Sequence, residues 1–234
     1  QVWLQFDGAM ADAKVYVNGQ FITGHRDGYT PFDVLLTPHL LRGENQITVV
    51  IDGSENPEIA PFGGQIDYLT YAGIYRHVWL KTTDDLRIKN VQAIADHVLA
   101  DEKSLNVAVF LEQVAAGDLH GELVAQLTTS AGEVVATHTL AISSSQHRVD
   151  FSVSNLTGIR LWDVDNPVLY QLNVNICGTN FSHQFSTRVG FRQAEFTAEG
   201  FLLNGRMLKL RGINRHQSYP YVGYAMGDHA QKAD

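Results

Sequence analysis

The sequence predicts an almost entirely β-stranded fold: two β-sandwiches followed by the first strand of a (β/α)8 TIM barrel. Short β-branched or aromatic runs bounded by turn residues fill most of the 234 residues, and no long amphipathic helix interrupts them. Asn-Gly pairs at 18–19 and 204–205 each join two such runs, and this dipeptide is a strong hairpin signal. An apolar run at 208–213 ends in polar side chains, as a barrel strand does at its functional end.

The first block of strands is expected to span residues 1–84. Its apolar runs are 2–6, 13–17, 20–22, 45–51 and 74–80. The position of Trp3 and Trp79 within strands predicts that both side chains are core residues. For Tyr68, Tyr71 and Tyr75, core packing is likewise favoured over the alternative, a stacking platform for sugar rings.

The second block is expected to span residues 85–189 and to form an immunoglobulin-like sandwich. Seven short strands separated by turn signals are typical of that fold. The predicted strands are 90–98, 105–114, 122–128, 134–140, 148–153, 170–176 and 181–189. The Cys…Trp…Cys spacing of antibody domains is missing. A third part, 190–234, begins with two hairpin turns and leads into the predicted barrel strand.

Composition excludes several classes of function. The net charge of −8 and the absence of a Lys/Arg cluster argue against a nucleic-acid partner. No apolar run has the roughly 20 residues of a membrane span, so no membrane association is expected. Cys177 is the one cysteine, which excludes an intramolecular disulfide, and its strand context predicts a buried, inert thiol. The chain opens inside a predicted strand at Gln1, so the natural N-terminus is expected upstream and targeting is not defined.

Four polar residues follow the predicted barrel strand: Asn214, Arg215, His216 and Gln217. In (β/α) barrels, functional side chains gather at the C-terminal ends of strands. Histidine and arginine can donate hydrogen bonds to sugar hydroxyls. Ordinary loop polarity is the competing interpretation, and the nearby tyrosines are expected to serve packing.

Several motifs in order along the chain resemble glycoside hydrolase family 2, and most of all its β-galactosidases. The first block resembles the family's N-terminal jelly-roll domain, the second its immunoglobulin-like domain, and the third the start of its barrel. The matching motifs are FDG (6–8), VNG (17–19), GEN (43–45), GIYRHV (73–78), LWDVDNPVLY (161–170), VGFR (189–192), NG (204–205) and LRGINRHQSYP (210–220).

The resemblance implies a retaining glycosidase that removes terminal β-D-galactose from β-galactosides. That reaction needs two carboxylic acids about 5–5.5 Å apart, a nucleophile and an acid/base. In the family both are glutamates on later barrel strands, so this chain alone is expected to be inactive. The resemblance also implies Mg and Na in the intact enzyme but no cofactor in this fragment. A homo-oligomer in the cytoplasm is expected.

The resemblance carries a sugar-binding role to a few residues. His216 matches a histidine that contacts the galactosyl group and stabilises the transition state; a loop histidine bonded to the backbone is the alternative. Asn214 and Arg215 belong to the same motif, and shaping of the strand end is their other interpretation. Asp67 matches a jelly-roll aspartate that binds sugar hydroxyls and can ligate sodium, while an Asx-turn is equally compatible with its context.

Two rival functions remain open. A non-catalytic carbohydrate-binding β-sandwich module would use the same folds, because fold alone does not decide function. The barrel start after Gly190 argues against it, since a binding module has no need of that segment. The other rivals are sister activities of the family, β-glucuronidase and β-mannosidase. The Asn-Arg-His-Gln string favours galactosidase. A glucuronidase also needs cationic groups for its carboxylate, and we expect those groups outside this segment.

Overall fold

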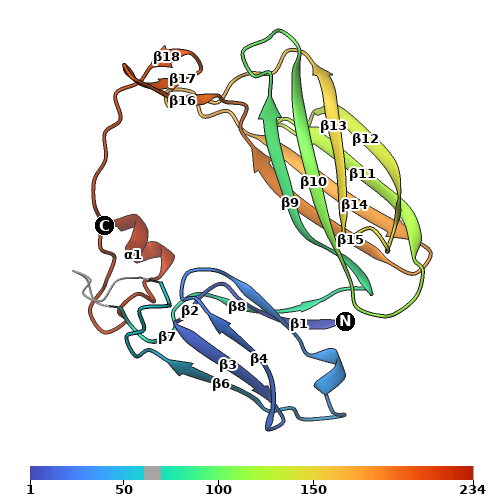
Figure 1. Ribbon diagram of the computed structural model, residues 1–234, viewed down its shortest axis with the longest axis vertical. Coiled ribbons are helices and arrows are strands. Elements are labelled where there is room, and N and C mark those ends of the chain that lie inside the picture. Colours follow the sequence, from blue (N-terminus) through green and yellow to red (C-terminus); the bar gives the residue numbers. More distant parts are fainter. Residues whose placement is uncertain (61–69, 234) are drawn as a thin grey trace. The chain divides into compact units, whose positions relative to one another are not determined.

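The computed structural model of the chain describes residues 1–60 and 70–233. They form two compact units (Figure 1): residues 1–82 with 213–234, and residues 83–212. The second half of the C-terminal part thus belongs to the same unit as the first sandwich, although more than a hundred residues separate them in sequence. No helix among the described residues is long and apolar enough to cross a membrane.

The first unit is built around two small antiparallel sheets. One has the strand order β5-β1-β8, the other β4-β3-β6, and β2 pairs with β7 beside them. A 3₁₀ helix, Thr37–His39, follows β5, and α1, Asp228–Ala233, closes the chain. The strands are β1 Val2–Phe6, β2 Ala9–Met10, β3 Asp12–Val17, β4 Gln20–Arg26, β5 Phe32–Leu35, β6 Ile47–Asp52, β7 Gly73–Ile74 and β8 Val78–Thr82.

A compact apolar core lies between these sheets. Its fully buried residues come from β1, β3, β5 and the turn after β5. Phe6 stacks on Phe32 with 4.8 Å between ring centroids. The β3–β4 hairpin turns at Asn18 and Gly19, whose φ angles of 51° and 82° are those that a type I′ turn requires. This confirms the hairpin predicted from the Asn-Gly pair.

The second unit confirms the predicted seven-stranded sandwich. One sheet has the order β13-β10-β9 and the other β12-β11-β14-β15. The inward residues of both sheets form one continuous core. Cys177 corrects the prediction of a buried thiol: Ile176 points into the core, so its neighbour Cys177 points outward and is exposed. The strands are β9 Leu86–Asp96, β10 Lys103–Gln113, β11 His120–Thr128, β12 Val134–Ser143, β13 Arg148–Leu156, β14 Tyr170–Gly178 and β15 Ser182–Val189.

A small three-stranded meander follows the second sandwich. It comprises β16 Ala194–Thr197, β17 Gly200–Leu203 and β18 Arg206–Met207. Asn204 and Gly205 form the predicted type I′ turn, with φ of 51° and 73°. The Asn204 side chain donates to the Trp162 carbonyl oxygen at 2.9 Å, which ties the turn to the corner between β13 and β14.

The barrel strand predicted at 208–213 is not formed: no strand is assigned between Met207 and the bridge at Tyr219. Leu210 and Ile213 are 60% and 94% exposed. A strand exists only through hydrogen bonds to a neighbour, and a first barrel strand pairs with other strands of the barrel. This segment has no such partner in the described residues, so it carries no strand there.

Candidate sugar-binding site

The C-terminal segment packs onto the jelly roll through aromatic contacts. The Tyr224 ring lies edge-on to Tyr71 at 5.0 Å and to Tyr75 at 6.0 Å between centroids. Gly223 has a φ of +54°, and a Cβ at this position would lie 2.9 Å from the Tyr71 ring. A larger residue would push the two segments apart. These contacts bring residues 215–231 against the GIYRHV motif.

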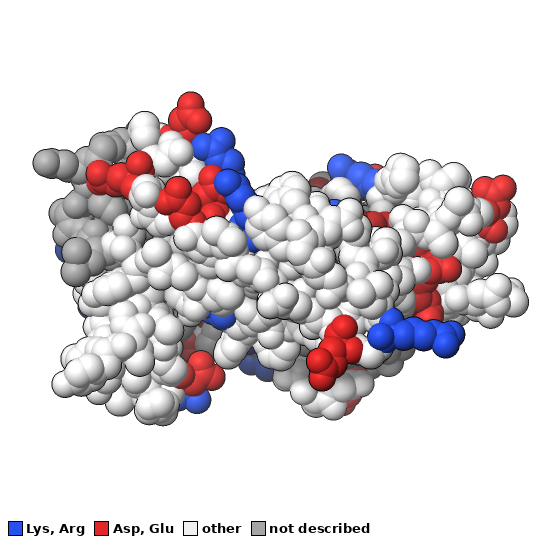
Figure 2. Space-filling view, turned by 90° about the horizontal axis from the view of Figure 1, so that it is seen from below, with Lys and Arg blue, Asp and Glu red and all other residues white. Residues whose placement is uncertain are grey.

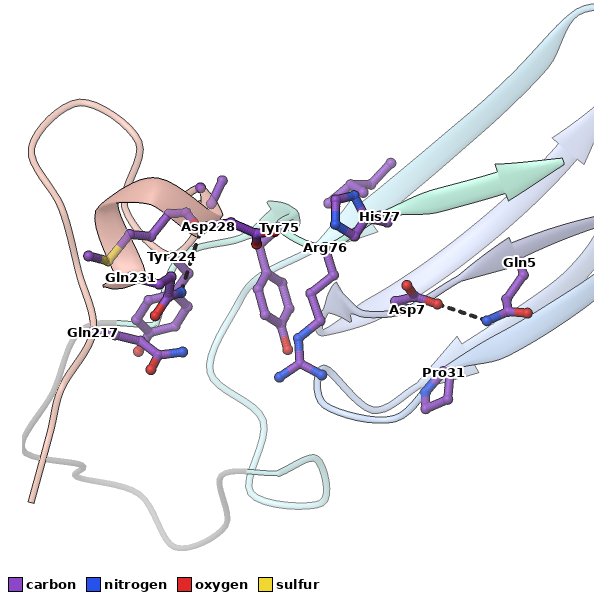
Figure 3. Close-up of a pocket in the computed structure, with 14 residues that line it drawn as sticks. Gln5, Asp7, Pro31, Tyr75, Arg76, His77, Gln217, Tyr224, Asp228 and Gln231 are labelled. Atoms are coloured by element: carbon purple, nitrogen blue, oxygen red, sulfur yellow. Dashed lines mark hydrogen bonds between the residues drawn. The ribbon is translucent and has the colours of Figure 1, made fainter. Parts of the chain in front are cut away.

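Two adjoining cavities form where these segments meet. The smaller one, of about 270 Å³, is lined by Tyr29, Tyr75, Arg76, Arg215, His216, Gln217 and Tyr224. The larger one, of about 880 Å³, shares four of those residues, Tyr75, Arg76, Gln217 and Tyr224, and continues to β1 and α1. Figure 3 shows the larger cavity, with Gln217, Tyr224 and Gln231 on one side and Arg76, Asp7 and Gln5 on the other.

The structure brings two of the predicted site residues together. Arg215 and His216 both line the smaller cavity. Arg215 Nη1 also donates to Gln231 Oε1 of α1 at 3.3 Å, which orients the guanidinium. Asn214 is exposed and lines neither of these two cavities. Asp67 lies in 61–69, outside the described residues, so its predicted role stays a prediction.

The jelly roll supplies residues that were not predicted to bind. Tyr75 was assigned to packing, yet it lines both cavities. Its hydroxyl donates to the Gly28 carbonyl oxygen at 2.7 Å. Burial raises the pKa of Tyr75 above its ordinary 10.0, with Arg76 opposing the rise and Asp27 adding to it, so the phenol stays a donor. In the sequence, the GIYRHV motif that contains Tyr75 was the signal that could have indicated this binding role.

Arg76 adds a second guanidinium to the site. Its charged end lies 5.2 Å from the centroid of the Tyr75 ring, within cation–π range. With Arg215 it supplies cationic donors, while Tyr29, Tyr75 and Tyr224 supply ring faces. Such a lining can hold a pyranose ring by its hydroxyl groups and its apolar face, and it can also accept a carboxylate.

Asp7 and Asp228 bring carboxylates to the larger cavity. Both oxygens of Asp7 accept hydrogen bonds at 2.8 Å, one from Gln5 Nε2 and one from Trp79 Nε1. Trp79 is therefore not the core residue that its strand context predicted; it is 46% exposed, whereas Trp3, predicted in the same way, is buried. β8 is an edge strand whose outer face lies open, and alternation alone does not reveal this.

A bound metal ion needs several donor side chains close together. The described residues contain no group of three or more His, Cys, Asp or Glu side chains that could hold one. Asp67, the candidate sodium ligand, lies outside them. No step of the chemistry is therefore assigned to a metal bound by this part of the protein.

Acidic and basic side chains are interspersed among neutral ones on the face of the molecule in Figure 2. No broad basic surface forms on that face.

Comparisons with known proteins agree with this architecture. Residues 1–84 match the model "Glycosyl hydrolases family 2, sugar binding domain", and residues 86–192 match the model "Glycosyl hydrolases family 2". The β-galactosidase of Thermoanaerobacterium thermosulfurigenes is 44% identical over 237 aligned residues, covering 100% of this chain and 33% of the relative. The β-galactosidase of Rhizobium meliloti is 50% identical over 205 residues, covering 86% and 26%.

A solved structure extends the comparison to three dimensions. It is β-glucuronidase 2 of Bacteroides uniformis, covalently bound to cyclophellitol-6-carboxylate aziridine. The TM-score is 0.89 at 27% identity, covering 100% of this chain and 29% of that one. The chain spans about a third or less of the length of these relatives. Two family models in the expected order, with relatives matched along the chain, carry one conclusion: this chain belongs to glycosyl hydrolase family 2.

Proposed function

We propose that the protein containing this chain is a retaining β-galactosidase that removes terminal β-D-galactose. The observation that carries the proposal is the smaller cavity, where His216 and Arg215 of the C-terminal motif meet Tyr75 and Arg76 of the jelly roll. Two relatives at 44% and 50% identity bear the name β-galactosidase. In this proposal the cavity holds the galactosyl group while the rest of the barrel performs bond cleavage.

The chemistry divides between this chain and the remainder of the protein. Retaining hydrolysis requires a nucleophile and an acid/base about 5–5.5 Å apart. Both oxygens of the Asp7 carboxylate already accept hydrogen bonds, from Gln5 and Trp79, so Asp7 is poorly placed to act as a nucleophile or acid/base. We therefore expect both catalytic carboxylates to come from later barrel strands and the isolated 234-residue chain to be inactive. Mg and Na sites, homo-oligomers and a cytoplasmic location belong to the same proposal.

His216 provides the first test. An imidazole that donates to the sugar during bond cleavage contributes most where charge develops, in the transition state. We expect His216→Ala in the intact protein to lower kcat/KM for a nitrophenyl β-D-galactoside. The loss should correspond to about 2–4 kcal/mol of transition-state stabilisation, the scale of one lost transition-state donor. His147→Ala, an exposed histidine of the second unit, is the matched control. Unchanged kinetics in His216→Ala would falsify the assigned role.

A second candidate function is β-glucuronidase, and a specific observation favours it. Two guanidinium groups, Arg76 and Arg215, line the smaller cavity, although the cations a glucuronidase needs were expected outside this segment. Guanidinium groups recognise carboxylates well. Assaying the intact protein on nitrophenyl β-galactoside, β-glucuronide and β-mannoside decides between them. Hydrolysis of the galactoside alone supports the proposal; faster hydrolysis of the glucuronide replaces it. Binding without hydrolysis of any of the three would favour the non-catalytic module.

A further inference from the structure

Trp79 has an unusual setting for a large aromatic side chain. It lies on the edge strand β8, is 46% exposed, and pairs in register with Gln5 of β1. Its indole nitrogen donates to Asp7 Oδ2 at 2.8 Å, and Asp7 Oδ1 accepts from Gln5 at 2.8 Å. Asp7 is itself fixed, because its backbone nitrogen donates to the His77 carbonyl oxygen at 3.0 Å. The indole is therefore held in one orientation while much of its surface stays in water.

Polar groups surround this fixed ring. The His77 ring lies 5.4 Å from the Trp79 ring, tilted by 54°. Lys81, two residues further along β8, contacts the Gln5 side chain. The indole ring, an apolar plate, is bordered by an imidazole, an amide, a carboxylate and an ammonium group. This arrangement matches a pyranose, whose C–H groups can stack on the indole while its hydroxyls bond to the polar border. A preoriented aromatic ring also loses little entropy on binding.

The plate is continuous with the candidate site. Gln5, Asp7 and His77, which adjoin Trp79, all line the larger cavity. That cavity also includes Gln217 and Tyr224, which line the smaller cavity with His216. Figure 3 shows this path, from Gln217 and Tyr224 past Tyr75 and Arg76 to Asp7 and Gln5. A ligand longer than one sugar, seated beside His216, can follow this surface to β8.

We propose that Trp79, with Asp7 and His77, forms a remote sugar subsite that makes the enzyme selective for galactosyl oligosaccharides. The inference rests on the proposed function. An enzyme that removes a terminal galactose in the His216 cavity leaves the other sugars of its substrate on the reducing side, so the Trp79 plate binds one of those units. Its ligand class is a neutral hexopyranose within a β-linked chain.

The test uses the intact protein and two substrates. Nitrophenyl β-D-galactoside has no sugar beyond the cleaved galactose, so Trp79→Ala should keep its kcat/KM within about twofold of wild type. For β-linked galacto-oligosaccharides of increasing length, wild-type kcat/KM should rise with length. In Trp79→Ala this rise should disappear, with a loss of about tenfold on the longer members, the scale of one aromatic binding contact. Trp79→Phe, which retains a plate without the Asp7 bond, should be intermediate.

Phe21→Ala is the matched control, because Phe21 is an exposed aromatic residue, at 53%, on β4 of the same unit and lines neither cavity. It should behave as wild type on every substrate. Equal kinetics of Trp79→Ala and wild type at all lengths overturn the subsite while leaving galactosidase activity intact. Failure of wild type to hydrolyse either substrate overturns the proposed function instead. Calorimetric titration with a galacto-oligosaccharide then tests the subsite separately: binding that Trp79→Ala abolishes supports it, and binding that Trp79→Ala retains overturns it.

Discussion

At the scale of single residues, Asn204 joins three parts of the second unit. Its φ of 51° places it in the left-handed region, where Asn is tolerated far better than most residues. Its side chain donates to the Trp162 carbonyl oxygen at 2.9 Å and accepts from the Gln193 backbone nitrogen at 3.0 Å. One side chain thus holds the turn, the corner at Trp162 and the exit from β15 together.

Substitutions at position 204 should separate these two contributions. Asn204→Gly keeps the turn conformation and loses the side-chain hydrogen bonds, which should cost about 1–3 kcal/mol of unfolding free energy. Asn204→Ala loses the bonds and also strains the backbone, adding about 1–2 kcal/mol. Urea unfolding of the chain measures both. Equal stabilities of the Gly and Ala variants would show that the turn conformation contributes nothing.

Residue-level prediction succeeded where local chemistry fixes the outcome and failed where tertiary context does. Asn-Gly specifies its turn regardless of surroundings, so both hairpins were predictable. Trp79 and Tyr75 were assigned to packing because their strand context suggested burial. Whether an edge strand is covered on a given side depends on neighbours that are distant in sequence, and that information is absent from a local pattern.

At the scale of elements, the seven strands of the second sandwich were predictable because turn residues separate short apolar runs, each of which contributes side chains to one continuous core. Two of those strands are also joined by charge. Arg87 of β9, with a side chain only 7% exposed, binds Glu112 of β10 at 2.5 Å, and Lys89 approaches the same carboxylate at 3.1 Å. Burial of Glu112 acts to raise its pKa, but the hydrogen bond and charge of Arg87, then those of Lys89, outweigh it. The pKa lies below the ordinary 4.5.

This ion pair predicts a pH dependence. A carboxyl whose pKa is lowered on folding stabilises the fold fully above its unfolded value, here near 4.5, and that contribution is lost as the pH falls through the lower folded value. Glu112→Gln should therefore reduce stability at pH 7 by about 1–3 kcal/mol, discounted for partial exposure, and should flatten the decline below pH 4.5.

Asp150→Asn is the control, because Asp150 pairs with Arg148 on the surface at 2.8 Å and both side chains are more than half exposed. It should change stability at pH 7 by less than about 1 kcal/mol, as is usual for an exposed ion pair. Thermal unfolding between pH 3 and pH 7, a range chosen about the ordinary carboxyl pKa, records both variants. A Glu112→Gln profile parallel to wild type would contradict the assignment.

At the scale of the whole molecule, the two units differ in how completely their cores are covered. The second unit has a continuous buried core, whereas the first leaves apolar side chains of β8 exposed. In the first unit, Val78 and Leu80 of β8 lie opposite Phe6 and Leu4 of β1, on the core side of the sheet. They are nevertheless 42% and 68% exposed. The long-range partners that would cover this side, like those of the barrel segment at 208–213, are not among the described residues. Elements that depend on such partners were the ones that the sequence described least well.

The exposed core side of β8 should make the isolated chain self-associate. An edge strand with apolar residues on an uncovered face is a template for pairing with another chain. We expect wild-type chain to form concentration-dependent oligomers in sedimentation velocity runs and Leu80→Lys to suppress them, because a charge at an edge opposes strand pairing. Leu41→Lys is the matched control. Leu41 is 64% exposed, similar to the 68% of Leu80, but it lies outside any strand. If both lysine variants suppressed association equally, general surface apolarity would be responsible, and β8 would have no special part in it.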